Sequence, residues 1–162
     1  MAETLSVSDM LPNKFEPKRK FRWVFSIEGI DAFLIKSAAR PNVTISEQEI
    51  QFINSRRYLA GKANFDAITV VMYDPIAPSG AQQVMEWVRT HFESVSGRAG
   101  YADFYKRDCQ LKMLDPVGTV VELWDLKGCF LTAAQFGDLD YGTEDPTEIS
   151  LTIRFDNCVL QY

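Results

Sequence analysis

Hydrophobic and polar residues alternate along several stretches of the chain, and this period of two predicts β-strands. The clearest stretches are residues 21–27 and 148–155, where every second residue is apolar. Gly29 and Asp31 favour a turn after the first stretch. We therefore expect residues 33–38 to return as its hairpin partner.

A second hairpin is predicted in the C-terminal half. Residues 109–114 and 119–126 flank the motif Asp115-Pro116-Val117-Gly118. Proline in the second place and glycine in the fourth favour a type I turn. Residues 128–135 are predicted as a further strand, followed by an acidic loop over residues 136–146.

One stretch has the period of a helix. Apolar side chains recur at spacings of three and four from Ala81 to Phe92, with Trp87 at the margin of the stripe. Ser79 and Gln82 fit a capping box just before it. The pattern predicts a single helix of about four turns, which ends near Gly97 and packs on a sheet.

Residues 50–74 combine two different patterns. The first part, together with residues 44–49, can be extended but is polar on both sides, and Asn54 and Ser55 favour a turn at its tip. From Phe65 onward the chain is apolar on both faces, so both faces of that strand should be covered. An extended polar arm that buries nothing of its own gains no compensation for its ordering entropy. We interpret it as a contact with another copy of the chain.

These elements sum to about seven strands and one helix, which predicts a mainly β fold. The expected architecture is an antiparallel β-sandwich or barrel with one flanking α-helix and a long protruding hairpin. Residues 1–16 are assigned to an N-terminal arm. Residues 17–162 are assigned to one β-barrel domain, because 162 residues suit a single core.

Charge and composition narrow the function classes. The net charge of -5 argues against a protein that holds nucleic acid by its phosphates. The N-terminal sequence lacks the features of a signal peptide, and no apolar run approaches the length of a membrane span. We therefore expect a cytosolic protein without membrane insertion.

Candidate chemistry is sparse, and no enzyme, metal site or cofactor is predicted. His91 is the only histidine, and its place in the helix favours a surface position. Residues 138–149 fail the EF-hand pattern, because glycine comes one place early and Ile149 stands where glutamate is required. The cysteines are expected as buried thiols, since their spacing matches no zinc or disulfide framework; they are Cys109, Cys129 and Cys158.

A short basic run precedes and enters the first strand. It is formed by Lys18, Arg19, Lys20 and Arg22. Such a run is typical of an exposed strand edge. The alternative is that it pairs with an acidic surface of a neighbouring subunit.

Several segments in this order resemble the tail tube proteins of contractile-tailed bacteriophages, a fold group that includes the type VI secretion tube protein. The resemblance covers most of the chain from about Phe21 onward. It is carried by residues 36–41, 52–57, 60–61, 65–66 and 69–74, by the helix around Trp87, and by residues 101–106, 126–128 and 149–157.

The resemblance implies a structural subunit of a virion tail. Six copies would form a ring whose strands close into one barrel around a lumen, and rings would stack inside a contractile sheath in the host bacterial cytoplasm. Sheath, baseplate and tube-terminator proteins would be partners. The hairpin would contact the adjacent ring through Glu47, Glu49, Gln51, Ile53, Asn54, Ser55, Arg56, Arg57 and Tyr58.

The resemblance also implies a role for the net negative charge of the chain. Carboxylates along a lumen would repel phosphates and let DNA pass without specific binding. Glu122 and Glu148 are the candidate lumen carboxylates. Two alternatives within the fold group stay open: a tube-initiator or baseplate protein, and a tube subunit of a contractile injection system. A ligand-binding β-barrel is a third, although it gives no reason for a polar hairpin.

Overall fold

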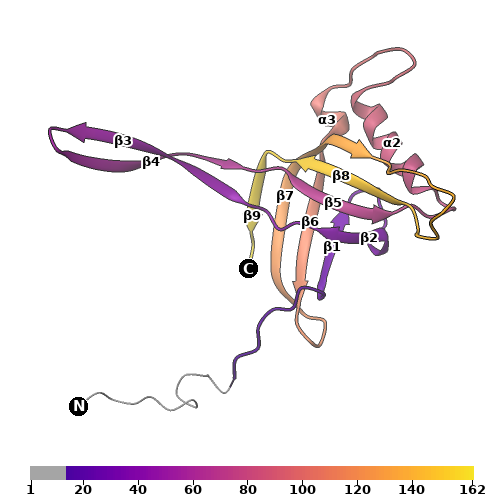
Figure 1. Ribbon diagram of the computed structural model, residues 1–162, viewed down its shortest axis with the longest axis horizontal. Helices are drawn as coiled ribbons and strands as arrows, with labels where there is room; N and C mark the ends of the chain where they lie inside the picture. Colours follow the sequence, from indigo (N-terminus) through magenta and orange to yellow (C-terminus); the bar gives the residue numbers. More distant parts are fainter. Residues whose placement is uncertain (1–13) are drawn as a thin grey trace.

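The computed structural model describes residues 14–162, so residues 1–13 of the expected arm lie outside the described part (Figure 1). Within that part the chain is mainly antiparallel β-structure. The strands are β1 (Trp23–Ile27), β2 (Ile35–Ala38), β3 (Val43–Phe52), β4 (Ser55–Phe65), β5 (Ile68–Tyr73), β6 (Arg107–Leu114), β7 (Val120–Gln135), β8 (Glu148–Arg154) and β9 (Asn157–Leu160). The helical elements are η1 (Ala32–Leu34), α2 (Gly80–His91) and α3 (Ala102–Tyr105).

Seven strands form one curved sheet in the order β1-β6-β7-β8-β5-β2, with β9 paired to β7. Strand β7 connects the two halves, because its first part pairs with β6 and β9 and its last part with β8. At the bend between these parts Gly128 has a φ of +67°, and a Cβ there would lie 2.3 Å from Asp156 Oδ2. The bend therefore requires glycine.

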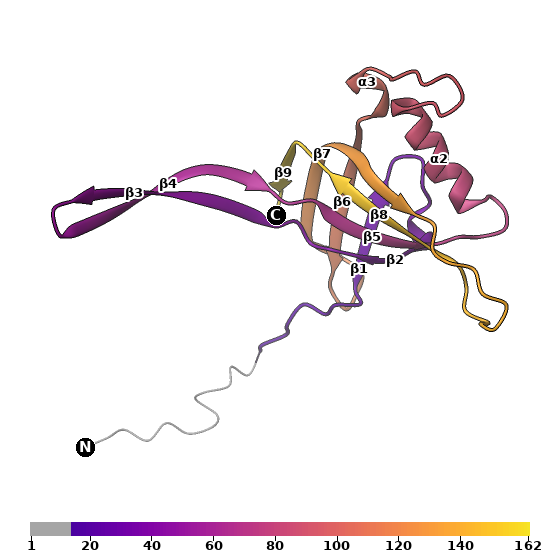
Figure 2. The ribbon, with the colours of Figure 1, turned by 45° about the horizontal axis from the view of Figure 1, so that its top comes forward.

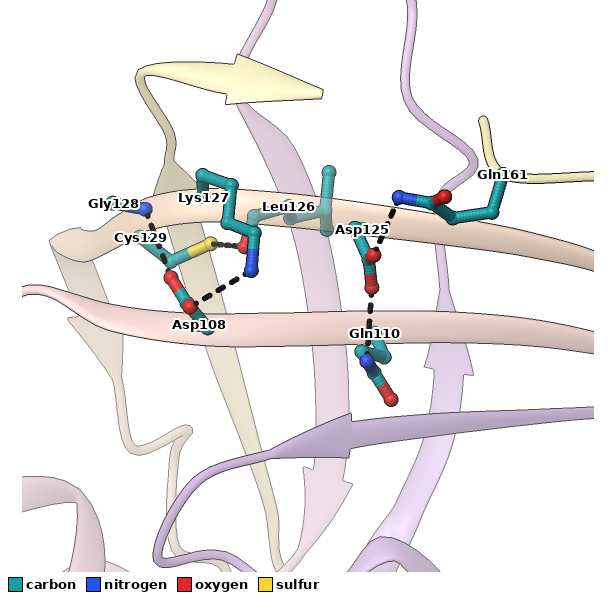
Figure 3. Close-up of polar contacts among 8 residues, drawn as sticks. All are labelled: Asp108, Gln110, Asp125, Leu126, Lys127, Gly128, Cys129 and Gln161. Atoms are coloured by element: carbon teal, nitrogen blue, oxygen red, sulfur yellow. Dashed lines mark hydrogen bonds and ion pairs between the residues drawn. The ribbon is translucent and has the colours of Figure 1, made fainter. Parts of the chain in front are cut away.

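Polar pairs fix the outer side of β6 and β7 (Figure 3). Gln110 donates to Asp125 at 2.9 Å, and Gln161 near the C-terminus donates to the other oxygen of the same carboxylate at 2.9 Å. Lys127 pairs with Asp108 at 3.1 Å beside the Gly128 bend. The Gln161 bond holds the C-terminal residues against β7, and the other two contacts join β6 to β7.

The hydrophobic core lies between the sheet and α2. Alternate residues of β5 and β8 are buried on one side, and Val84 and Trp87 of α2 pack against them. Trp87 is at the centre of this contact rather than at its margin, and its Nε1 donates to the backbone oxygen of Tyr105 at 2.7 Å. The largest fully buried side chains of β5 and β8 are Ile68, Val70, Met72, Ile149, Leu151 and Ile153.

The predicted helix is confirmed, but its ends differ. It stops at His91 instead of near Gly97, and Phe92 is 49 % exposed. The Ser79 side chain makes no cap hydrogen bond; instead Asp74 accepts the backbone N–H of Ala81 at 3.2 Å. The short helix α3 was not expected, because the sequence predicted a single helix.

The first predicted hairpin is wrong, whereas the second is confirmed. Strand β1 pairs with β6, and β2 pairs with β5. The reason is that β2 leads into β3 and β5 follows β4, so the β2–β5 pairing continues the β3–β4 pairing as one ribbon. Strands β6 and β7 form the expected hairpin, with Gly118 N–H donating to the Asp115 oxygen at 3.1 Å. The two strands predicted at 119–126 and 128–135 are one strand, β7, and β9 was not predicted.

Candidate subunit-interaction surface

The β3–β4 hairpin extends far from the rest of the molecule in both views (Figures 1 and 2). Every residue from 43 to 64 is exposed, and Phe65 at the root is half-buried. The hairpin forms its own two-stranded sheet. A two-stranded hairpin alone is at best marginally stable in water, so this one needs a covering partner to gain stability by burial.

The tip of the hairpin is a two-residue turn at Ile53 and Asn54. Phe52 and Ser55 are the last paired residues, and the Ser55 hydroxyl donates to the Phe52 oxygen at 2.8 Å. Ile53 has a φ of 51°, in the left-handed region that β-branched residues rarely adopt. The turn predicted at Asn54 and Ser55 is therefore shifted by one residue.

One face of the outer hairpin is polar. Cross-strand pairing places Glu47, Glu49 and Gln51 of β3 on the same face as Arg56 and Tyr58 of β4. Arg56 Nε lies 3.2 Å from Glu49 Oε1, so the guanidinium is already paired within the chain. Glu47 on the same face has no ion pair among the described residues, so one carboxylate of this face remains unpaired.

The opposite face of the outer hairpin, called the apolar face below, carries exposed apolar side chains among the polar residues Gln48, Ser55 and Arg57, so both faces contain polar residues as expected. Ile50, Phe52 and Leu59 share this face, and Phe52 is 71 % exposed. Arg57 lies opposite Ile50 on the same face and has no ion pair among the described residues. The spacing of Ile50 and Phe52 could have indicated this face, but Leu59 joins them only once the register is known.

The root of the hairpin is tied to the sheet through a buried carboxylate. Glu122 lies on the inner side of β7, opposite Met113, and is 4 % exposed. Arg40, between β2 and β3, donates to it at 2.6 Å, and Lys18, which precedes β1, also pairs with it. Trp124 Nε1 is a further donor. Glu122 therefore joins the hairpin root and the N-terminal segment to β7.

The environment of Glu122 favours its charged form. Burial of the carboxylate alone would raise its pKa, but the hydrogen bonds from Lys18 and Trp124 and the charge of Arg40 outweigh burial and lower the pKa. This placement corrects the expected lumen role of Glu122. Its side chain faces inward and its charge is compensated within the chain, so it has no free carboxylate to offer a lumen.

The basic run is only partly engaged. Lys18 pairs with Glu122, Arg19 Nε lies 3.7 Å from Glu16 Oε1, and the Arg22 guanidinium lies over the Phe21 ring at 5.1 Å. Lys20 is exposed and has no ion pair in residues 14–162. A contact of this run with a neighbouring subunit stays a prediction.

The outer face of β5 and β8 is uncovered, contrary to the expectation for β5. Thr69 and Tyr73 of β5 are exposed, because α2 covers the opposite side. Their partners across the strand pair are Thr152 and Glu148. Glu148 pairs with Lys36, and this hydrogen bond raises the pKa of Lys36. The candidate lumen carboxylate Glu148 thus lies on an open face but is already paired.

Other titratable groups show no catalytic arrangement. His91 is exposed and its ring contacts Tyr105 edge-on, with ring centres 4.5 Å apart. Cys109 and Cys129 are buried as expected, whereas Cys158 is half-buried and burial raises its pKa to about 11. In residues 14–162 no three His, Cys, Asp or Glu side chains are placed to hold a metal ion. No helix in that range has the length and apolarity needed to cross a membrane.

The fold is similar to that of known contractile-machine proteins. A chain of the anti-feeding prophage tube-terminating cap superposes with a TM-score of 0.76 at 14% identity, over 97% of this chain and 99% of that one. A chain of the sheath/tube terminator of the extracellular contractile injection system PVC gives 0.75 at 15%, over 92% and 99%. A chain of the PVC sheath–tube complex gives 0.72 at 15%, over 98% and 99%. The chain therefore has the predicted tail-tube-like fold.

The sequence comparisons add no relative to this structural likeness. No family model matches the chain, and no curated protein matches it. At these identities the structural likeness establishes the fold and nothing finer.

Proposed function

We propose that the protein is a structural, non-enzymatic subunit of the tube of a contractile tail or injection machine. The observation that carries the proposal is the long hairpin, whose outer half presents Ile50, Phe52 and Leu59 to solvent on one face. Exposed apolar side chains gathered on one face mark an interaction surface. Stacking of one ring on the next would cover this face.

The sheet supports closure of copies into a ring. The part formed by β7, β8, β5 and β2 ends in two edges, because within residues 14–162 β2 pairs only with β5 and residues 130–135 of β7 pair only with β8. Free strand edges recruit further strands unless they are protected. Pairing of β2 of one copy with β7 of the next would use both edges and close a ring, which we propose is hexameric.

The uncovered face of this sheet would then line the lumen. It carries hydroxyl groups of Thr69, Ser150 and Thr152, and the charge of Glu148 is offset by Lys36. Arg154 lies on the same face of β8 and donates to Asn64 at 3.4 Å, so it adds one positive charge. A lining of low net charge offers a phosphate backbone few cations to bind, so DNA would pass without specific contacts. Sheath, baseplate and tube-terminator proteins are the proposed partners, in a tail assembled in the host bacterial cytoplasm and carried by the virion.

A second candidate is a tube or terminator subunit of an extracellular contractile injection system. It is favoured by the likeness to chains of the PVC and anti-feeding prophage structures. The two candidates share the assembly surfaces and differ in cargo.

Electron microscopy of the purified protein tests the proposal. Rings or tubes with a central hole are the expected result, formed spontaneously or after nucleation by baseplate components. A chain that stays monomeric under both conditions would contradict the assembly role. Nanomolar DNA affinity of assembled tubes at physiological salt would contradict the conduit.

The two arginines near the tip make the test specific. Arg57→Glu places a carboxylate on the apolar face, so we expect it to abolish stacking into long tubes while single rings persist. Arg56→Glu changes the polar face, loses the Glu49 pair, and should weaken stacking less. If both variants stack like the unmodified chain, the assignment of this hairpin to the ring contact is wrong.

A further inference from the structure

A groove lies where the two ends of the curved sheet approach each other, between β1 and β2. Two adjoining hollows share Lys20, Trp23 and Lys36, and both have walls from β1 or the segment just before it and from β2. Strand β1 pairs only with β6, and β2 pairs only with β5. In residues 14–162 the groove is therefore bordered by two strand edges with free backbone donors and acceptors.

The side chains of the groove combine an apolar surface with a basic rim. Trp23, Leu111 and Met113 line its inner part, and Phe33 stands at its margin with 80 % of its surface exposed. The positive charges around it come from Lys18, Arg19, Lys20, Lys36 and Arg40. Glu122 pairs with both Lys18 and Arg40, and Glu148 pairs with Lys36, so three of these cations share two carboxylates. Among residues 14–162, Lys20 has no ion pair and Arg19 has only the exposed Glu16. The chemistry suits an extended segment with apolar and acidic side chains.

We propose that the groove binds residues 1–13 of a second copy of the chain as a β-strand added to the edge of β1, which leaves the edge of β2 for the proposed ring contact. This segment contains Glu3 and Asp9 but no lysine or arginine, so its side-chain charge complements Lys20. One polar residue separates Leu5 from Val7, so an extended segment would direct both toward the same side. The choice of a second copy as the source rests on the proposed assembly role.

The direction of the chain supports a second copy over the same chain. From β1 toward the N-terminus, residues 17 to 14 lead away from the sheet in both views (Figures 1 and 2). Thirteen residues in extended form reach roughly 43 Å. The segment could thus reach an adjacent copy without reversing direction, whereas binding to its own groove would require a turn.

A peptide-binding experiment tests the groove without requiring tubes. The probe is a synthetic peptide of residues 1–13 with a C-terminal fluorophore, and its anisotropy is followed as the full-length chain is added. Saturable binding is expected. Lys20→Glu in the chain, or Glu3→Lys with Asp9→Lys in the peptide, should weaken binding at least tenfold. Arg98→Glu, the same charge change in the exposed stretch between α2 and α3, should leave binding unchanged.

Three outcomes would overturn the proposal: binding no tighter than that of a scrambled peptide, binding insensitive to Lys20→Glu, or displacement of the probe by a peptide of residues 43–65. The last would assign the groove to the hairpin. Because Lys20 is exposed, the Lys20→Glu variant should fold. Phe33→Asp, also at an exposed position, is a second variant that should weaken peptide binding to the same groove. Rings without peptide binding would reject this inference alone, and binding without rings would reject the tube role alone.

Disulfide cross-linking distinguishes the two sources of the segment. Val7→Cys and Ser37→Cys are introduced together with Cys158→Ser, while the buried Cys109 and Cys129 are kept. Oxidation should link one chain to another and give species of two or more chains on denaturing gels. A link confined to single chains would show that the segment fills its own groove, contrary to the proposal.

Discussion

Residues 35–73 form one continuous antiparallel ribbon whose two halves differ completely in burial. In the inner half, β2 and β5 belong to the large sheet, and Val70 and Met72 are fully buried. In the outer half, β3 and β4 pair just as regularly, yet residues 43–64 are all exposed. Backbone pairing is thus shared along the ribbon, while burial is confined to one end.

The difference in burial indicates that the inner half stabilises the single chain, whereas the outer half is available for assembly. The inner half gains free energy from apolar area removed from water in the single chain. The outer half also carries apolar side chains, such as Ile50 and Phe52, but no second layer of the described chain covers them. In the proposed assembly the missing layer is a neighbouring ring.

The largest expected effect comes from comparing a leucine-to-alanine substitution in the buried core with the same substitution on the exposed hairpin. Leu151→Ala, in β8 beside the inner half, should lower the free energy of unfolding by about 2–5 kcal/mol, because it leaves a cavity in the core. Leu59→Ala on the hairpin should change it by less than about 0.5 kcal/mol. Denaturant unfolding of the unassembled chain measures both. Equal losses would mean that the hairpin is covered within the single chain.

The connection between the halves should carry the next largest effect. Glu122→Gln leaves Lys18 and Arg40 without their carboxylate, and we expect a loss of about 1–3 kcal/mol. Glu148→Gln, a matched change at the half-exposed pair with Lys36, should cost far less. Chemical denaturation at neutral pH compares the two variants.

The Glu122 effect should depend on pH with a definite sign. The folded-state pKa of Glu122 lies below its ordinary value of 4.5, so its ionised form contributes stability above that value. This contribution disappears as the pH falls through the lower, folded-state pKa. The difference in unfolding free energy between the unmodified chain and Glu122→Gln should therefore shrink below about pH 4.5. A difference that grows on acidification would contradict the ion-pair role.

Local patterning predicted the elements whose burial arises within the chain. The alternation in residues 148–155, the turn at residues 115–118 and the helical stripe around Val84 each have neighbours in the same chain, and each is found. The partner of β1 was missed, because the hydrophobic period does not specify which strand lies alongside. The link between β1 and β6 spans more than 80 positions, as in the pair Phe25 and Leu111.

The sequence located the candidate interaction surface on the hairpin, but it did not predict which residues share each face. The hairpin was predicted from the resemblance and from its poor self-burial, whereas its apolar face depends on the register that sets Leu59 beside Ile50. Glu122 was misplaced for a related reason. A glutamate between Val121 and Leu123 looks solvent-facing, and only the distant Lys18 and Arg40 allow it to lie inside.

Hydrogen exchange should show the same contrast at the level of backbone amides. In the unassembled chain, peptides from residues 43–65 should exchange at least about tenfold faster than those from residues 68–73, a difference of about 1.4 kcal/mol in opening free energy. Exposed pairing without a covering layer opens more readily than pairing in the core. Assembly should slow exchange in the hairpin. A hairpin as protected as β5 before assembly would remove the basis of the comparison.

The smallest expected effect concerns the ion pair on the polar face of the hairpin. Arg56→Gln removes the pair with Glu49, and both side chains are substantially exposed. Solvent screening and side-chain entropy limit such pairs, so the unfolding free energy should change by less than about 0.5 kcal/mol. Arg57→Gln, the same change at a neighbour without an ion pair in the described residues, is the control, and a cycle with Glu49→Gln isolates the coupling. Exposed ion pairs contribute about 0.5 kcal/mol. A coupling energy between Arg56 and Glu49 well above about 0.5 kcal/mol would mean that the hairpin's own charges stabilise it. Its stability would then not depend on a neighbouring ring.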